Sequence, residues 1–229
     1  MAGPGVPRTG APGPVLSRDG NGHMPVTIDD RTAVPSDARI RALHERLAPS
    51  REALHLVWTH CRIVCDIAGQ LLDSSGADAD AALVRAGSLL HDIGVYRLYD
   101  EAGRLDERNY VRHGVLGHAL AREAGLPEVI ARFCSRHTGV GITRADVRRQ
   151  GLPIPAADYT AVTAEEHLVM YADKFHSKTT PPAFVSAASY AVAVRRFGPD
   201  KVDRFAALVE RFGEPDLPTL AARYRQPIV

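Results

Sequence analysis

The stretch Ser88–Tyr99, SLLHDIGVYRLY, places a histidine and an aspartate side by side at the end of an apolar run and follows them with a glycine. Its first seven residues end a longer segment, 78–94, in which apolar residues recur every three or four positions, as they do on one face of an amphipathic helix. The pattern predicts a buried helix that carries His91 and Asp92 on its last turn and stops at Gly94. Whether the pair forms a site therefore depends on ionisable groups elsewhere in the sequence that could lie close to it.

The same periodicity continues on both sides of the pair and predicts an all-α fold. A long helix is expected between Ser50, which can cap its start, and Gly76, which follows its end. The connection 140–163 contains one short helical candidate, opened by Thr143, and its apolar content indicates packing near a site. We find no convincing strand and no repeat. Further helices are expected within 110–125, 126–139, 163–178, 184–197 and 200–212.

Composition divides the chain into a tail and one domain. Residues 1–36 are rich in glycine, proline, serine and aspartate and hold few large apolar side chains. Such a composition buries too little surface to offset the entropy of ordering, which predicts a disordered tail over 1–36. The remaining residues, 37–229, are expected to form a single domain, because an apolar content of 45% suffices for one sizeable core.

The charge balance excludes several classes of partner. The 28 basic and 27 acidic side chains give a net charge of +1, so no global field favours nucleic acid or an anionic membrane surface. No stretch approaches the roughly 18 to 20 apolar residues that a membrane span needs. The three cysteines form no CxxC pair, which fits a reducing cytoplasm better than a disulfide framework. We expect a cytoplasmic protein that binds a small anionic substrate, with no nucleic acid or membrane partner, and the oligomeric state stays open.

Six potential metal ligands lie at the edges of the apolar stripes of five predicted helices. Each of them alone is more typical of a core histidine, a helix cap or an ion pair. The six together call for another explanation, because burying several imidazoles and two carboxylates near one core is unfavourable unless they form hydrogen bonds with one another or bind a cation. The set therefore favours a metal site. Its members are His60, His91, Asp92, His113, His137 and Asp173.

The order of these residues resembles the motif of the HD superfamily, and HDIG is the form found in its HDIG-type members. The strings RHGVLG, SRHTGVGIT and YADKFHSK are also similar to those of small HDIG proteins described as predicted phosphohydrolases. The resemblance covers roughly residues 50–180. It implies an all-α HD-domain helical bundle with a central metal site.

The resemblance also implies how the ligands are shared. One metal would be bound by His60, His91 and Asp173. A second would be bound by the two histidines that follow the pair, His113 and His137. Asp92 would bridge both metals. Members without the two added histidines hold one metal, so one or two divalent metals per chain are expected. Imidazole and carboxylate ligands suit Fe, Mn, Zn, Ni or Mg, and the lack of thiolates argues against a structural zinc site.

Other residues near the motif receive weaker assignments. His118 competes with His113 as a ligand, but the HGVLG form favours His113 and leaves His118 on the substrate side. Lys174, beside Asp173, is assigned with Asp92 to catalysis. Arg136 and Lys178 are candidates for binding the substrate, although each cation also fits a solvated charge at a helix end. His167 and His176 are expected on the surface or on the substrate side.

Three functions are compatible with this pattern. The first is a metal-dependent phosphohydrolase acting on a small phosphorylated metabolite or nucleotide, because a dinuclear centre activates water and orients a phosphoryl group. The second is a mixed-valent di-iron oxygenase that cleaves a small phosphonate or polyol with the same ligands. The third is a non-catalytic regulatory domain, against which the intact ligand set argues. Ligand identity alone does not separate the hydrolase from the oxygenase.

Overall fold

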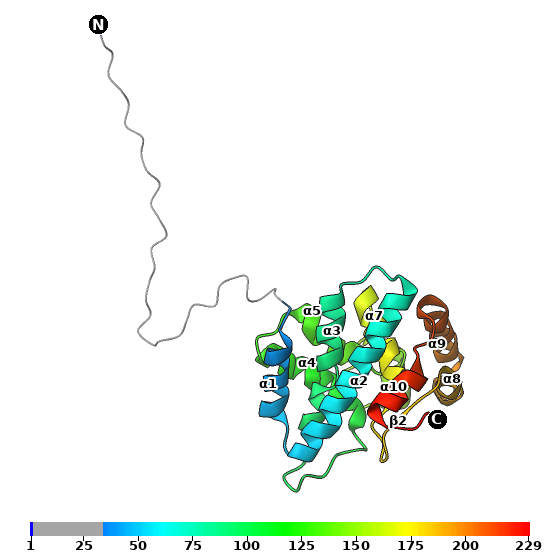
Figure 1. Ribbon diagram of the computed structural model, residues 1–229. Coiled ribbons are helices and arrows are strands. Elements are labelled where there is room, and N and C mark those ends of the chain that lie inside the picture. Colours follow the sequence, from blue (N-terminus) through cyan, green and yellow to red (C-terminus); the bar gives the residue numbers. More distant parts are fainter. Residues whose placement is uncertain (2–33) are drawn as a thin grey trace.

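The computed structural model describes residue 1 and residues 34–229, and helices account for most of this part of the chain (Figure 1). The long helix α2 runs through the bundle and packs against α3 and α7. The elements in chain order are α1 (Asp37–Leu47), α2 (Arg51–Ser75), α3 (Ala81–Leu90), η2 (Ile93–Leu98), η3 (Tyr110–Arg112), α4 (His113–Glu123), α5 (Glu128–Arg136), α6 (Arg144–Gln150), α7 (Ala164–Ala172), η4 (Asp173–Phe175), β1 (His176–Ser177), β2 (Ala183–Phe184), α8 (Ala187–Val194), η5 (Arg195–Phe197), α9 (Pro199–Phe212) and α10 (Leu217–Tyr224).

Local sequence signals explain where the principal helices begin and end. The Ser50 side chain accepts a hydrogen bond from a backbone N–H of the first turn of α2, and Gly76 ends that helix in the left-handed conformation. Thr143 and Thr163 each form a capping box at the start of α6 and α7. The predicted all-α bundle is therefore confirmed, and its helix boundaries follow from capping chemistry.

The structure differs from the expected fold in its C-terminal part. A small antiparallel sheet pairs His176 with Phe184 and Ser177 with Ala183, although no strand was expected. Helix α10 follows α9, and beyond it the Val229 backbone N–H donates to the Phe184 carbonyl at 2.9 Å. Strands of two residues are too short to show an alternating pattern, which is why the sequence does not reveal them.

The predicted tail lies largely outside the described residues, which resume at residue 34. Its last three residues belong to the folded part, which corrects the boundary at 36. Val34 packs against the core, and the Ser36 side chain accepts a hydrogen bond from the backbone N–H of Arg39 at the start of α1. Within residues 34–229, no helix combines the length and the apolar character that crossing a membrane requires.

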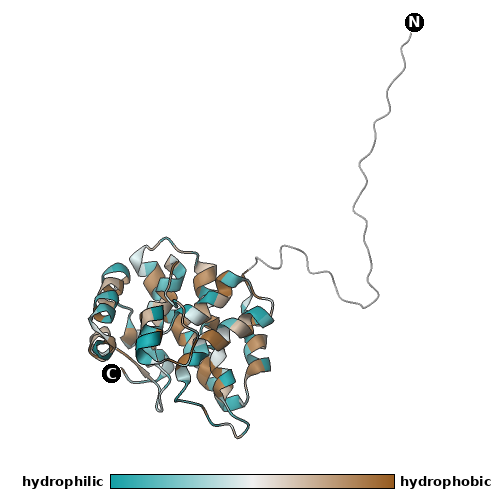
Figure 2. Cartoon of the chain, turned by 180° about the vertical axis from the view of Figure 1, so that it is seen from behind, coloured by the Kyte–Doolittle hydropathy of each residue, from teal (hydrophilic) through white to brown (hydrophobic). Residues whose placement is uncertain are grey.

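Helix α2 contributes to two apolar cores. Val57 and Cys61 belong to the core shared with α1, α3 and α5, whereas Ile63 and Val64 belong to the core shared with α7 and α9. Polar and apolar segments alternate along the helices, as Figure 2 shows, and the apolar faces build these cores. His60 lies on α2 where the two cores adjoin, so its side chain is held from both sides.

Glycine permits a backbone-to-backbone contact between η2 and α4. A Cβ atom added to Gly94 would lie 2.0 Å from the carbonyl oxygen of His113 and 2.3 Å from the amide nitrogen of Gly117. Real Cβ atoms do not approach backbone atoms this closely, so only glycine fits at position 94. The contact sets the distance between the turn that carries Asp92 and the helix that begins at His113.

We predict that Gly94→Ala lowers the free energy of unfolding by about 3 kcal/mol, because the added methyl group must push two backbone segments apart. Chemical denaturation measures this change. Gly69→Ala is the matched control, since a Cβ at Gly69 of α2 meets nothing within 4 Å. That substitution should stabilise the protein by about 0.5 to 1 kcal/mol through helix propensity. Equal stability of the two variants would contradict the close contact.

Candidate metal centre

Three histidines of the candidate site are oriented by backbone carbonyl groups one turn earlier. The Nδ1 atom of His91 lies 2.7 Å from the carbonyl oxygen of Ser88, and that of His113 lies 2.6 Å from the carbonyl oxygen of Tyr110. His137 makes the corresponding bond to Phe133 at 3.1 Å. A carbonyl oxygen can only accept, so Nδ1 carries the proton in each ring. The Nε2 lone pair of each ring is therefore free to bind a cation.

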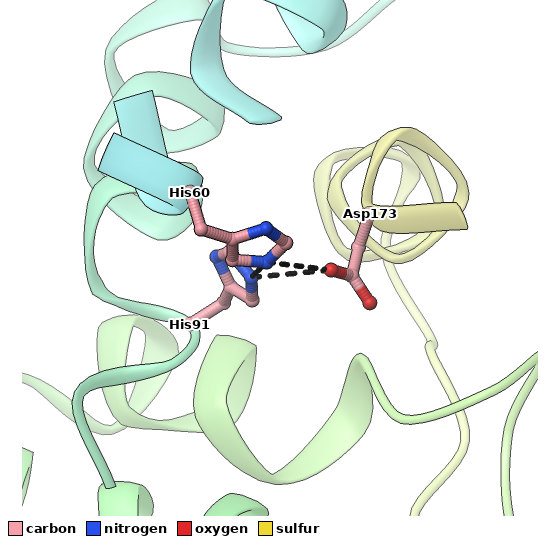
Figure 3. Close-up of side chains that lie close together, drawn as sticks. All are labelled: His60, His91 and Asp173. Atoms are coloured by element: carbon pink, nitrogen blue, oxygen red, sulfur yellow. Dashed lines mark hydrogen bonds and ion pairs between the residues drawn. The ribbon is translucent and has the colours of Figure 1, made fainter. Parts of the chain in front are cut away.

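The first set of donor atoms combines residues from α2, the turn after α3, and η4 (Figure 3). His60 Nε2 lies 3.1 Å from His91 Nε2, 3.0 Å from Asp173 Oδ1 and 3.2 Å from Asp92 Oδ2. His91 Nε2 lies 3.4 Å from Asp173 Oδ1 and 3.6 Å from Asp92 Oδ2. Two imidazoles and two carboxylates thus converge on one point.

The second set uses the other oxygen of the same aspartate. His113 Nε2 and His137 Nε2 are 2.9 Å apart, and each lies 3.4 Å from Asp92 Oδ1. This oxygen is buried and forms no hydrogen bond with any of the described residues. Leaving such an acceptor unsatisfied costs about 1 to 3 kcal/mol, which a bound cation would remove.

The spacing of the donor atoms fits a coordination shell. Ligand atoms that each lie 2.0 to 2.2 Å from a metal are roughly 2.8 to 3.6 Å from one another in octahedral or tetrahedral arrangements. The distances within the first set run from 3.0 to 3.6 Å, within this range. His60, His91 and Asp173 form one group able to hold a metal, and His91, Asp92 and His137 form another. The residues therefore fit divalent cations.

Burial and neighbouring charges favour the ligand forms of Asp92, His113 and His137, whereas burial at His91 is outweighed by Cys61 and Asp92, which raise the pKa of its ring well above the ordinary value. Burial opposes ionisation of Asp92, but the Lys178 ammonium and His91 outweigh it and hold the pKa of the carboxyl group well below its ordinary value. Burial lowers the pKa of His113 to about 3 and also lowers the pKa of His137. At neutral pH Asp92 is therefore an anion, and both imidazoles are neutral, as metal ligands must be.

A cavity of about 400 Å³ opens onto the donor atoms. Its lining includes Asp92, His113, His137, Asp173 and Lys178. Most of the other lining residues come from the segments 138–152 and 190–201, which contribute the apolar side chains of Val140, Ile142, Leu152, Val194 and Phe197 and the polar side chains of Asp146, Gln150, Arg196 and Lys201. The predicted connection 140–163 thus contributes to the site, as expected.

Comparison with known proteins agrees with this arrangement. Residues 57–178 match the family described as HD domain. The chain belongs to the HD domain family. The match covers more than half of the chain and includes all six candidate ligands. The resemblance inferred from the order of histidines and aspartates is therefore confirmed.

The HD domain chain resembles curated proteins over only part of their length. It is 38% identical over 117 residues to an uncharacterized protein of Methanocaldococcus jannaschii, and the alignment covers 50% of this chain and 62% of that protein. It is 33% identical over 128 residues to a tRNA (cytidine(56)-2'-O)-methyltransferase of Picrophilus torridus, covering 56% of this chain and 33% of the enzyme. The chain thus spans less than two thirds of either relative.

Two solved structures resemble the HD domain chain more distantly. Both are of the HD domain of the L. monocytogenes phosphodiesterase PgpH, one of them in complex with cyclic-di-AMP. Each is 16% identical, with TM-scores of 0.47 and 0.48. The alignments cover 81% and 82% of this chain and 98% and 97% of those chains. At these TM-scores the similarity adds nothing to the family assignment.

The structure changes the interpretation of three predicted site residues. Lys174 does not line the cavity: its ammonium donates to Asp173 Oδ2 at 2.7 Å and to the carbonyl oxygen of His137 at 3.1 Å, so it holds a ligand in place. Arg136 donates to the Thr160 carbonyl at 2.9 Å and does not line the cavity either. His118 bonds to Ser135 at 3.1 Å and is not among the residues that line the cavity, which argues against its assignment to substrate binding.

The structure also places Lys178 and His176. Lys178 lines the cavity and contacts Asp92 Oδ2 directly, and its assignment to substrate binding stays a prediction. His176 is buried, and its ring contacts His60 instead of the surface or the substrate side. Its position three residues after Asp173 is the only sequence signal that could have drawn attention to it.

We predict that Asp92→Ala weakens metal binding at both donor sets, because both include this carboxylate. His137→Ala should weaken binding at the second set alone. Isothermal titration with Mn²⁺ and elemental analysis of the loaded protein measure the affinity and the stoichiometry. Asp73→Ala, at an exposed position of α2, is the control and should bind metal as the wild type does. Full metal occupancy in Asp92→Ala would exclude the bridging role.

Proposed function

We propose that this chain is a metal-dependent phosphohydrolase that acts on a small phosphorylated metabolite or nucleotide, with two divalent cations bound by donor sets that share Asp92. The observation that carries the proposal is the cavity that is lined by residues of both donor sets and by Lys178. Membership of the HD domain family supports metal-dependent hydrolysis in general terms. The metal, its number per chain and the substrate are parts of the proposal.

Divalent cations at such a centre supply water activation and neutralise the negative charge of a phosphoryl group. The protein supplies rigidity and the correct ionisation states. Lys174 fixes Asp173, and carbonyl groups fix the rings of His91, His113 and His137, so the donor atoms are held in place before a ligand binds. Such preorganised positioning is the main protein contribution to phosphoryl transfer.

Lys178 is suited to bind a phosphoryl oxygen of the substrate. Its ammonium reaches the metal end of the cavity, contacts Asp92 and lies 5.8 Å from the centre of the Tyr110 ring. An ammonium group has three N–H donors, so the contact with Asp92 leaves donors for the substrate. In this position Lys178 would orient the phosphoryl group and stabilise negative charge that develops in the transition state.

The rest of the cavity indicates the remainder of the substrate. A volume of about 400 Å³ lies in the range typical of small-molecule sites. Its apolar walls, which include Val140 and Ile142, favour a planar or apolar group attached to the phosphate. Arg196 is exposed beside Phe197 and forms no ion pair within residues 34–229, so it can meet a second polar or anionic group of the substrate.

We predict that the protein reconstituted with Mn²⁺, Fe²⁺, Zn²⁺, Ni²⁺ or Mg²⁺ releases phosphate from at least one member of a panel of nucleotides and sugar phosphates. Lys178→Ala should lower kcat/KM by about 100-fold, because one donor to the transition state is lost. Lys178→Arg keeps the positive charge and should retain part of the activity. Coupled phosphate assays measure the rates, and elemental analysis verifies that each variant stays loaded.

The alternative outcome is equally measurable. An iron-loaded protein that consumes dioxygen with a phosphonate or a polyol, and releases phosphate from no ester of the panel, would overturn the hydrolase proposal.

A further inference from the structure

We propose that His176 and Gln226 form a hydrogen-bonded chain behind His60 that fixes the proton and the orientation of this ligand, so that the C-terminal segment sets the metal affinity of the first donor set. The proposal concerns the metal site and does not depend on the reaction that the site catalyses.

The direction in which these hydrogen bonds donate follows from the last acceptor, the side chain of Gln226. The amide oxygen Oε1 of Gln226 lies 2.7 Å from His176 Nε2, so Nε2 carries the proton of the His176 ring and donates it. The other nitrogen of a neutral imidazole must then accept. That nitrogen, His176 Nδ1, lies 2.7 Å from His60 Nδ1, which therefore donates. The Nε2 lone pair of His60 is left to face the donor atoms of His91 and Asp173.

His60 needs this arrangement because of where it lies. The other three histidine ligands follow or begin a helix and donate Nδ1–H to a backbone carbonyl one turn earlier. His60 lies in the interior of α2, where the backbone carbonyl groups already accept bonds from within the helix. A side chain from another segment must supply the acceptor, and His176 supplies it.

The position of His176 is itself built by the C-terminal part of the chain. His176 pairs with Phe184 across the β1–β2 sheet, and the two rings meet edge to face with centres 5.3 Å apart. Phe184 in turn accepts a backbone hydrogen bond from Val229 at 2.9 Å and donates one to Pro227 at 2.9 Å. Gln226 adjoins this pairing, and its backbone N–H donates to Ala221 at 3.1 Å.

His176 has no nitrogen left to bind a cation. Both nitrogens of His176 are already bonded, one to His60 and one to Gln226, so His176 is a positioning residue and not a further ligand. Partners of this kind, which bind the second nitrogen of a ligating histidine, typically change metal affinity by about tenfold to hundredfold.

The test measures metal binding in the full chain without substrate. His176→Phe keeps a ring of similar size against Phe184 but removes the acceptor for His60. We expect Mn²⁺ or Co²⁺ to bind about tenfold to hundredfold more weakly at one of the two donor sets, with the other set unchanged. Titration calorimetry gives the dissociation constants, and the visible spectrum of the Co²⁺-loaded protein reports the altered first coordination sphere. His55→Phe, at an exposed position of α2, is the matched control and should bind as the wild type does.

Gln226 provides a second test that disturbs the core less, because its side chain is half-buried. Gln226→Leu removes the acceptor for His176 and should weaken the same donor set. Gln226→Glu restores an acceptor oxygen and should recover the affinity, which a merely structural role would not explain. Wild-type dissociation constants in both Gln226→Leu and His176→Phe would overturn the proposal, as would an equal loss of affinity at both donor sets. None of these outcomes depends on whether a phosphate ester is hydrolysed.

Discussion

The candidate metal centre depends on the close approach of η2 to α4 at Gly94. Because the backbones touch there, Asp92, two residues before the contact, comes within 3.4 Å of the imidazole nitrogen of His113, which opens α4. The same carboxylate faces the first donor set with its other oxygen. Ligand positions tolerate errors of only about 0.2 Å, so a side chain at position 94 would separate the two halves of the site. The glycine of the HDIG stretch is thus as much a part of the site as the residues that precede it.

The sequence predicted the helices α2 to α9 and the six candidate donors because the information is local, whereas it did not single out α1 or α10. Apolar periodicity and caps determine each helix. The candidate donors lie beside the apolar stripes, which face the core. The roles of Lys174 and Arg136 could not be obtained in this way. Both adjoin a donor in sequence, but the direction of a long side chain depends on which acceptors the folded structure offers. Lys174 finds Asp173 and the His137 carbonyl, and Arg136 finds the carbonyl of Thr160.

His176 and Gln226 were beyond sequence reasoning for a different reason. Their contact joins residues that are far apart in the chain, through strands of two residues and a backbone pairing near Val229. Neither feature has a periodic pattern. A histidine three residues after Asp173 has the same appearance whether its ring faces solvent or another imidazole, and only the path of the C-terminal segment decides between them.

The lining of the cavity comes from two parts of the sequence. The donor atoms, Lys178 and the wall residues Val140, Ile142 and Leu152 lie within residues 57–178, the part that matches the HD domain family, whereas Val194, Arg196 and Phe197 lie outside it. Selection can therefore reshape the part of the cavity wall that lies outside the family match without altering a candidate metal ligand. An exchange of the α8–α9 segment between relatives would change this part of the wall and leave all six candidate ligands in place.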